Sequence, residues 1–162
     1  MLDSTLVFAL FMLGQVQVPK SPQICRGVEA TLRVMPSTFR RGTKPKFAVV
    51  LKNVSEKPER LLDVREGRRP DLAHSYYEII FEQNEQALKN LPRAISEPGP
   101  VEAADFFVLS LGAIVEAPLT TPADLSTLPG GPYSARVRIT LDPFSGLIPK
   151  CLSARTSFTV SK

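Results

Sequence analysis

The sequence predicts an all-β sandwich of about seven to nine short antiparallel strands. Apolar and polar residues alternate along most of the chain, so each strand would turn one face inward. Turn-forming residues separate these stretches, and the chain contains 15 prolines and 9 glycines. No long stretch has the periodicity of a helix. Two packed sheets are favoured over a closed barrel, because each expected strand has one polar face.

The first half of the chain carries expected strands at residues 28–34, 46–52, 60–64 and 76–82. In the second of these, Phe47, Val49 and Leu51 share one face. A turn that contains Asn53 and Pro58 follows it. A polar loop is expected before the fourth strand, which is aromatic and β-branched as strands prefer.

The second half carries expected strands at residues 105–109, 113–119, 133–141 and 152–160. In the third of these, every odd-numbered residue is apolar or Ala and every even-numbered residue is polar. Phe158 and Val160 are expected to face inward. Segments rich in Pro and Gly connect the strands, and one of them contains a single helical turn near Leu125. Such spacing, without an internal repeat, favours an immunoglobulin-like sandwich.

An apolar run at residues 5–13 is the clearest targeting signal. It is far shorter than the roughly 20 residues that span a bilayer, and it matches the hydrophobic region of a secretory signal peptide. We therefore expect a signal peptide at 1–19, a sandwich domain at 20–162, no membrane span, and a secreted or periplasmic location. A buried first strand is the alternative for this run.

The two cysteines agree with export. Cys25 and Cys151 each stand just before an expected strand, and no C-x-x-C motif accompanies them. In immunoglobulin-like sandwiches the first and last strands often lie side by side and run parallel, so they begin at the same end of a sheet. The positions predict a Cys25–Cys151 disulfide, with two unrelated thiols as the alternative.

Several segments resemble a group of bacterial immunoglobulin-like domains. The segments are 47–58 with 60–62, then 107–112, 123–126 and 129–137. Domains of this kind are similar to the one that precedes the catalytic part of deuterolysin-type zinc metalloendopeptidases and to the bacterial intracellular proteinase inhibitor domain. The resemblance covers residues 28–160 and implies the sandwich fold. The metalloendopeptidase motif H-E-x-x-H does not occur in the chain, so that activity is not implied.

Composition and spacing argue against catalysis. The net charge of +4 is a mild excess, without the dense basic stripe of a nucleic-acid-binding protein. The only histidine, His74, lies between Asp71 and Ser75, but the groups of a catalytic triad converge in space, which neighbours in a loop rarely do. Asp63, Glu66, Asp71 and His74 could together supply oxygen and nitrogen ligands to a metal ion, but their spacing matches no known metal site. We therefore expect that the chain is not an enzyme and that it binds no metal, no cofactor and no nucleic acid.

The densest basic cluster lies around Arg60 and the following loop. Arg65, Arg68, Arg69 and His74 are the candidate partner-binding residues, since guanidinium groups bind anionic partners through paired hydrogen bonds. A solvated loop is the alternative. The loops at 65–75 and 92–104 are the candidate surfaces.

Two short motifs admit two interpretations. Asn53-Val54-Ser55 fits the glycosylation sequon, but a turn here also requires Asn and Ser, and we favour the turn. The Phe106-Phe107 pair places one ring on each face of its strand. The inward ring belongs to the core, and the outward ring is either an exposed contact or covered by a loop.

The function expected from these observations is a non-catalytic, exported interaction module with a protein partner. The alternative is a proteinase inhibitor or propeptide-like module, which would insert a rigid loop into a protease cleft. The rigid loops available for this are Pro98–Pro100 and Pro129–Pro132.

Overall fold

The computed structural model describes residues 24–63, 70–89, 91, 99–119, 121, 123–141, 144 and 152–162. The expected signal peptide at 1–19 lies outside the described residues, as do Arg65, Arg68, Arg69 and Cys151. The predictions that concern them remain predictions. None of the described helices is long and apolar enough to cross a membrane.

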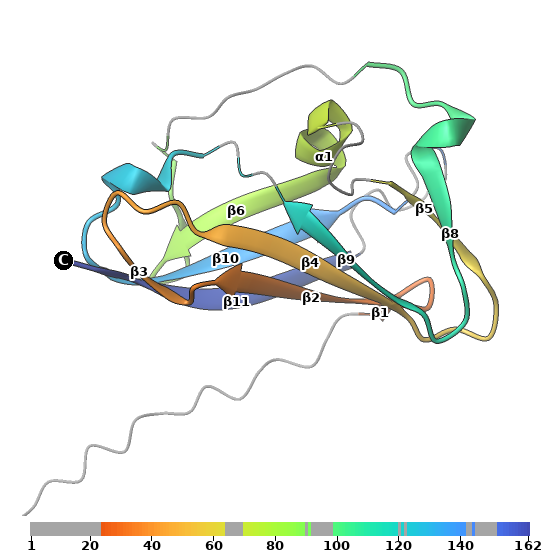
Figure 1. Cartoon of the computed structure of the whole chain (residues 1–162), viewed down its shortest axis with the longest axis horizontal. Coiled ribbons are helices and arrows are strands. Elements are labelled where there is room, and N and C mark those ends of the chain that lie inside the picture. The colour runs from red at the N-terminus through yellow and green to blue at the C-terminus, as the bar shows by residue number, and fades with distance from the viewer. Residues whose placement is uncertain are drawn as a thin grey trace, which may run out of the picture.

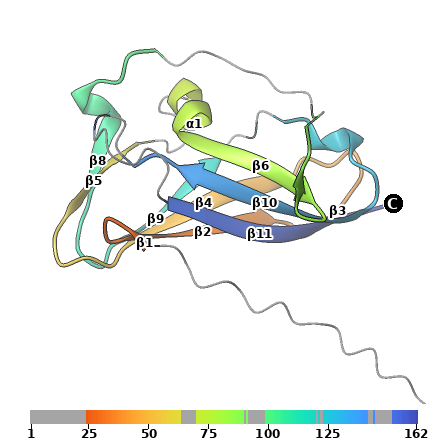
Figure 2. The same cartoon turned by 180° about the vertical axis from the view of Figure 1, so that it is seen from behind.

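Two sheets pack face to face (Figures 1 and 2). The antiparallel four-stranded sheet has the order β1 (Ile24–Cys25), β2 (Val28–Met35), β4 (Lys46–Asn53) and β9 (Ile114–Leu119). The five-stranded sheet has the order β3 (Thr38–Arg40), β11 (Leu152–Ser161), β10 (Gly131–Ile139), β6 (Tyr77–Gln83) and β7 (Gln86–Ala87). The predicted all-β sandwich is confirmed.

The remaining elements lie at the ends and edges of the sandwich. Two strands, β5 (Glu59–Leu62) and β8 (Phe106–Leu109), form a small antiparallel sheet of their own. The helical segments are α1 (Pro70–Tyr76), η1 (Ala103–Asp105) and η2 (Leu125–Thr127). The helical turn expected near Leu125 is η2, in which the Asp124 side chain accepts a hydrogen bond from the Ser126 amide.

The structure differs from the prediction in its short elements. The described residues form eleven strands, of which β1, β3 and β7 span only two or three residues and so have no alternation to detect. Part of the loop expected at 65–75 is helix α1. This helix begins at Pro70, which suits the first helical position, and only Leu72 of it enters the described core. A helix with a single apolar residue in the core does not produce the repeat of apolar residues every three to four positions by which a helix is recognised in a sequence.

The chain changes sheet after β2. The Met35–Pro36 peptide bond is cis, and β3 then pairs in parallel with β11, Thr38 opposite Thr159. The parallel neighbour of the last strand is therefore β3, and the expectation that β2 would lie beside β11 in one sheet is wrong. Strand β2 packs across the sandwich against β11 instead. Both strands begin at the end that carries β1 (Figure 1), and Cys25 there is 8% exposed.

The core is filled by the predicted inward residues. Phe47, Val137, Phe158 and Val160 are all 3% exposed or less. The Phe158 ring stacks on Tyr133 at 5.6 Å and meets the edge of Phe47 at 5.9 Å, so aromatic rings from both sheets meet in the interior.

Tyr133 also fixes one corner of the sandwich. Its hydroxyl donates a 2.9 Å hydrogen bond to the Pro129 carbonyl, four residues earlier. This arrangement at the start of a strand ties the preceding Pro129–Gly130 connection to the sandwich.

Strands β5 and β8 form an arm at one end of the molecule (Figures 1 and 2). Strand β4 turns into β5, and β8 turns into β9, so the β4–β9 pair continues past a corner as the β5–β8 pair. One side of the arm closes the end of the core with Leu61 and Leu109. On the other side Arg60 and Val108 are exposed, Phe106 is half-buried, and Leu62, the Cα partner of Phe106, is buried.

Candidate interaction surface on the arm

Of the predicted partner-binding residues, only His74 is within the described residues. It lies in α1, and its side chain is outside the described part. The two loops proposed as binding surfaces do meet, since the Gly99 amide donates a 3.1 Å hydrogen bond to Asp71 Oδ2. The backbone of the arm leads directly into both segments, through Leu62 on one strand and Phe106 on the other.

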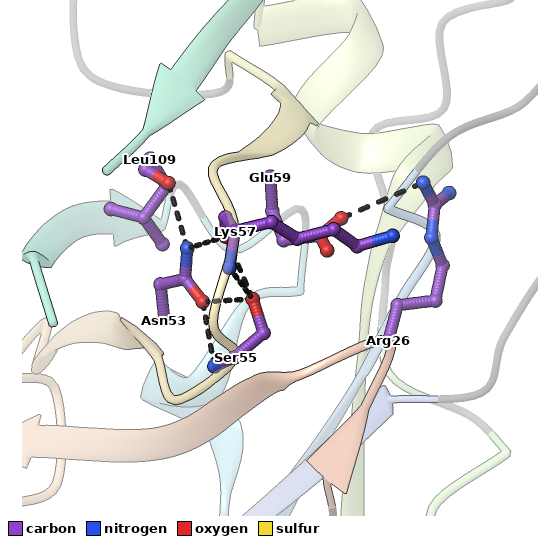
Figure 3. Close-up of polar contacts among 6 residues, drawn as sticks. All are labelled: Arg26, Asn53, Ser55, Lys57, Glu59 and Leu109. Atoms are coloured by element: carbon purple, nitrogen blue, oxygen red, sulfur yellow. Dashed lines mark hydrogen bonds and ion pairs between the residues drawn. The ribbon is translucent and has the colours of Figure 1, made fainter. Parts of the chain in front are cut away.

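Asn53 holds the corner between the sandwich and the arm (Figure 3). Its side chain is fully buried, and Nδ2 donates to the carbonyls of Lys57 at 2.8 Å and Leu109 at 2.9 Å. Its Oδ1 accepts from the Ser55 amide at 2.9 Å and the Ser55 hydroxyl at 2.8 Å. Both donor hydrogens and both lone pairs of the amide are therefore used. The side chain joins the β4–β5 turn to β8.

The favoured interpretation of the Asn53-Val54-Ser55 motif, a turn, is confirmed. The atom that would carry a glycan, Asn53 Nδ2, is buried and donates to two backbone carbonyls. Attachment of a sugar in the folded chain would replace one of the two N–H donors, break the hydrogen bond that it makes, and expose the corner.

The turn between β1 and β2 is tied to the same corner. The Val54 amide donates a 2.7 Å hydrogen bond to the Gly27 carbonyl. Gly27 has a φ of +74°, and a β-carbon on it would lie 2.2 Å from the Ser55 β-carbon. Only glycine allows this approach. Beside it, the Arg26 guanidinium lies 3.6 Å from the buried carboxylate of Glu59, the first residue of the arm (Figure 3).

The outward side of the arm is apolar and carries one cation. We call Arg60, Phe106, Val108 and Phe144 the arm face. Arg60 and Val108 are Cα partners across the β5–β8 pair, and the Arg60 guanidinium carbon lies 4.1 Å from the centre of the Phe106 ring. The Phe144 ring lies 6.2 Å from the Phe106 ring. Val108 is 63% exposed and Phe144 is 68% exposed, values close to those of Ile114 at 64% and Ile24 at 62%.

Arg60 differs from Arg33 and Arg138 on the two sheets. Arg33 lies 3.3 Å from Glu116, and Arg138 lies 3.9 Å from Glu78. Within the described part of the chain, Arg60 has no ion pair, and its guanidinium contacts the Phe106 ring instead. The arm face therefore presents a positive charge that no carboxylate among the described residues neutralises.

The outer face of the five-stranded sheet carries a cluster of two arginines around one glutamate. Glu82 is 4% exposed, and its carboxylate lies 2.9 Å from Arg136 and also pairs with Arg155. Arg155 additionally donates to the Ser134 hydroxyl at 3.3 Å. A buried carboxylate needs such partners, so these arginines stabilise the sheet. Two guanidinium groups share this one carboxylate, and Arg136 Nε is buried without a hydrogen-bond partner among the described residues.

One open cavity of about 410 Å³ lies between the β3–β4 and β9–β10 connections. Lys44, Asp124 and Ser126 contribute its polar groups. Hydrogen bonds from Ser126 lower the pKa of the Asp124 carboxyl, and Lys44 contributes in the same direction. Because Asp124 is fully exposed and caps η2, it is a solvated carboxylate rather than a base. In the described ranges no three His, Cys, Asp or Glu residues are placed to hold a metal ion.

The sequence predicts only part of the arm face. The alternation of Phe106 and Phe107 predicts one outward ring, and Arg60 belongs to the basic cluster. Their contact depends on the pairing of β5 with β8, which are more than 40 residues apart in the chain, and no local pattern predicts that pairing. Nothing in the sequence distinguishes Phe144, which the fold brings beside Phe106.

Comparison with known proteins finds no protein family and no curated protein sequence that matches this chain. The resemblance to bacterial immunoglobulin-like domains therefore remains a prediction.

Proposed function

We propose that the chain is a non-catalytic interaction module that binds a protein partner through the arm face. The observation that carries this proposal is the pair of exposed side chains, Val108 and Phe144, beside Arg60 stacked on Phe106. Arginine and bulky aromatic side chains are enriched among the few residues that contribute most of the binding energy at protein interfaces.

The corner at Asn53 makes this surface suitable for binding. A flexible arm would lose conformational entropy when a partner ordered it. Here the strand pairing, the Asn53 hydrogen bonds and the Arg26–Glu59 ion pair already hold the arm against the sandwich. The arm face is therefore pre-organised.

The proposal includes export and a Cys25–Cys151 disulfide. Its supports are the apolar run at 5–13 and the position of Cys25 at the end of the molecule where β11 begins. A disulfide at that position would fasten the terminal strand β1 to the last strand.

The proteinase-inhibitor alternative would need a loop that projects freely. The Pro129–Pro132 segment is instead part of the sandwich, since Tyr133 binds the Pro129 carbonyl and Gly131 is paired with Val160. Pro98 lies outside the described residues. The arm face is the better supported binding surface.

The test replaces single residues by a photoreactive amino acid in the full chain. One version carries it at Val108, and a control carries it at Ser157, which is exposed on the outer face of the five-stranded sheet. In an extract of the source organism, the Val108 version should form a saturable crosslink to one protein. Unlabelled wild-type chain should compete for it, and the unlabelled double variant Val108→Asn/Phe144→Ser should not. Equal crosslinking from Ser157, or competition by the double variant, would refute the proposal.

A further inference from the structure

The orientation of Arg60 indicates what it can still bind. A guanidinium that lies over an aromatic ring uses its flat face, while its N–H donors point outward in the plane. The 4.1 Å separation from the Phe106 ring centre is within the range of such a contact. No described residue accepts a hydrogen bond from the Arg60 side chain, so its N–H donors are available for a planar, two-oxygen acceptor.

The carboxylates of the arm are used elsewhere. Glu59 precedes Arg60 but points to the other side of the strand, where its buried side chain pairs with Arg26. Asp105 Oδ2 accepts a 2.8 Å hydrogen bond from the Glu102 amide at the start of η1. None of the described carboxylates is within ion-pair distance of Arg60.

Apolar surface surrounds this charge. Val108 lies opposite Arg60 across the strand pair, and Phe144 lies beside the ring that supports the guanidinium. A ligand that covered Val108 and Phe144 would also remove water from Arg60, and this strengthens a charge-assisted hydrogen bond. The complementary group is a carboxylate with an apolar neighbour.

We propose that the arm face recognises an aspartate or glutamate side chain next to an aliphatic or aromatic one in its protein partner. Arg60 binds the carboxylate, and Val108 and Phe144 cover the apolar neighbour. This inference rests on the proposed function, because it names the chemistry of the partner at the same surface.

The test begins with a phage-displayed library of random dodecamer peptides selected on the full chain. The enriched peptides should carry Asp or Glu adjacent to an apolar residue. The consensus peptide, labelled with fluorescein, is then measured by fluorescence anisotropy. Arg60→Leu should weaken its binding about tenfold or more, because a charge-assisted hydrogen bond is lost. The control Arg40→Leu, which removes an exposed arginine from β3, should leave the affinity unchanged.

The outcomes separate this inference from the proposed function. Peptides that require Val108 and Phe144 but lack acidic residues would show that the acidic preference is wrong. Peptides that bind the Arg60→Leu variant as tightly as the wild type would show the same, although in either case the arm face still binds. If the Val108→Asn/Phe144→Ser variant binds all selected peptides as well as the wild type, both proposals fail. Raising the salt from about 0.05 M to about 0.5 M should weaken the wild-type complex more than the Arg60→Leu complex.

Discussion

The side-chain amide of Asn53 donates a 2.9 Å hydrogen bond to the backbone carbonyl of Leu109, 56 residues further along the chain. This contact joins the end of β4 to the last residue of β8 at the corner where the sandwich continues as the arm. The position of the proposed binding surface depends on it.

Replacing Asn53 by alanine should destabilise the chain by about 1–3 kcal/mol. The variant leaves the buried carbonyl of Leu109 without its side-chain donor, and an unmet buried group costs about that much. The Lys57 carbonyl keeps the 2.7 Å hydrogen bond from the Ser55 hydroxyl. Urea unfolding measures the change as a lower midpoint. The exposed Gln86→Ala variant serves as the control and should unfold like the wild type. An unchanged midpoint for Asn53→Ala would show that the corner does not depend on this amide.

Two glycines provide a matched test of the close approach at the corner. Gly27 and Gly42 both have a positive φ, +74° and +85°, but only Gly27 lies against another residue. Gly42→Ala should cost about 1 kcal/mol from backbone strain alone. Gly27→Ala should cost clearly more, because its β-carbon would overlap Ser55. Equal losses of thermal stability would contradict the packing at the β1–β2 turn.

The buried tyrosine predicts a loss of stability at alkaline pH. Burial raises the pKa of Tyr77 far above its ordinary value, and the nearby Asp63 carboxylate adds to the shift. Because the folded state keeps the phenol protonated, the stability is complete below the unfolded pKa of about 10 and falls as the pH rises above it.

The check is urea unfolding between about pH 8 and pH 11. The Tyr77→Phe variant loses the titrating group, so its stability should fall less steeply than that of the wild type. Parallel curves for the two proteins would mean that Tyr77 is accessible to solvent.

The predicted Cys25–Cys151 disulfide can be tested by mass spectrometry. The oxidised chain should resist alkylation under denaturing conditions and accept two alkyl groups after reduction. Loss of a bridge that closes so long a loop should lower the stability by about 4–5 kcal/mol in the chain-entropy model. Alkylation of both thiols without reduction would show that the bridge does not form.

Sequence periodicity predicted the sandwich because a half-buried strand must alternate its side chains. The residues named as inward, such as Phe47 and Phe158, are buried, and Asn53 is the turn residue expected. The short strand β3 and helix α1 were missed, since elements of three and seven residues with one buried side chain have no measurable period.

The candidate site was less predictable than the fold. Sequence clustering selected Arg65, Arg68 and Arg69, whereas the structure singles out Arg60, which precedes them. The distinguishing property of Arg60 is its contact with Phe106, a residue brought near by long-range strand pairing. The number of arginines in a sequence segment does not show which of them form ion pairs in the folded chain. Arg136, for example, pairs with Glu82.

The most direct test of the central claim is a map of amide chemical shifts on the isotope-labelled chain, titrated with the selected consensus peptide. Binding at the arm face predicts that the largest shifts occur in Glu59–Leu62 and Phe106–Leu109, with Phe144 included. Shifts concentrated instead on the outer face of the five-stranded sheet, around Arg136 and Arg155, would contradict the account.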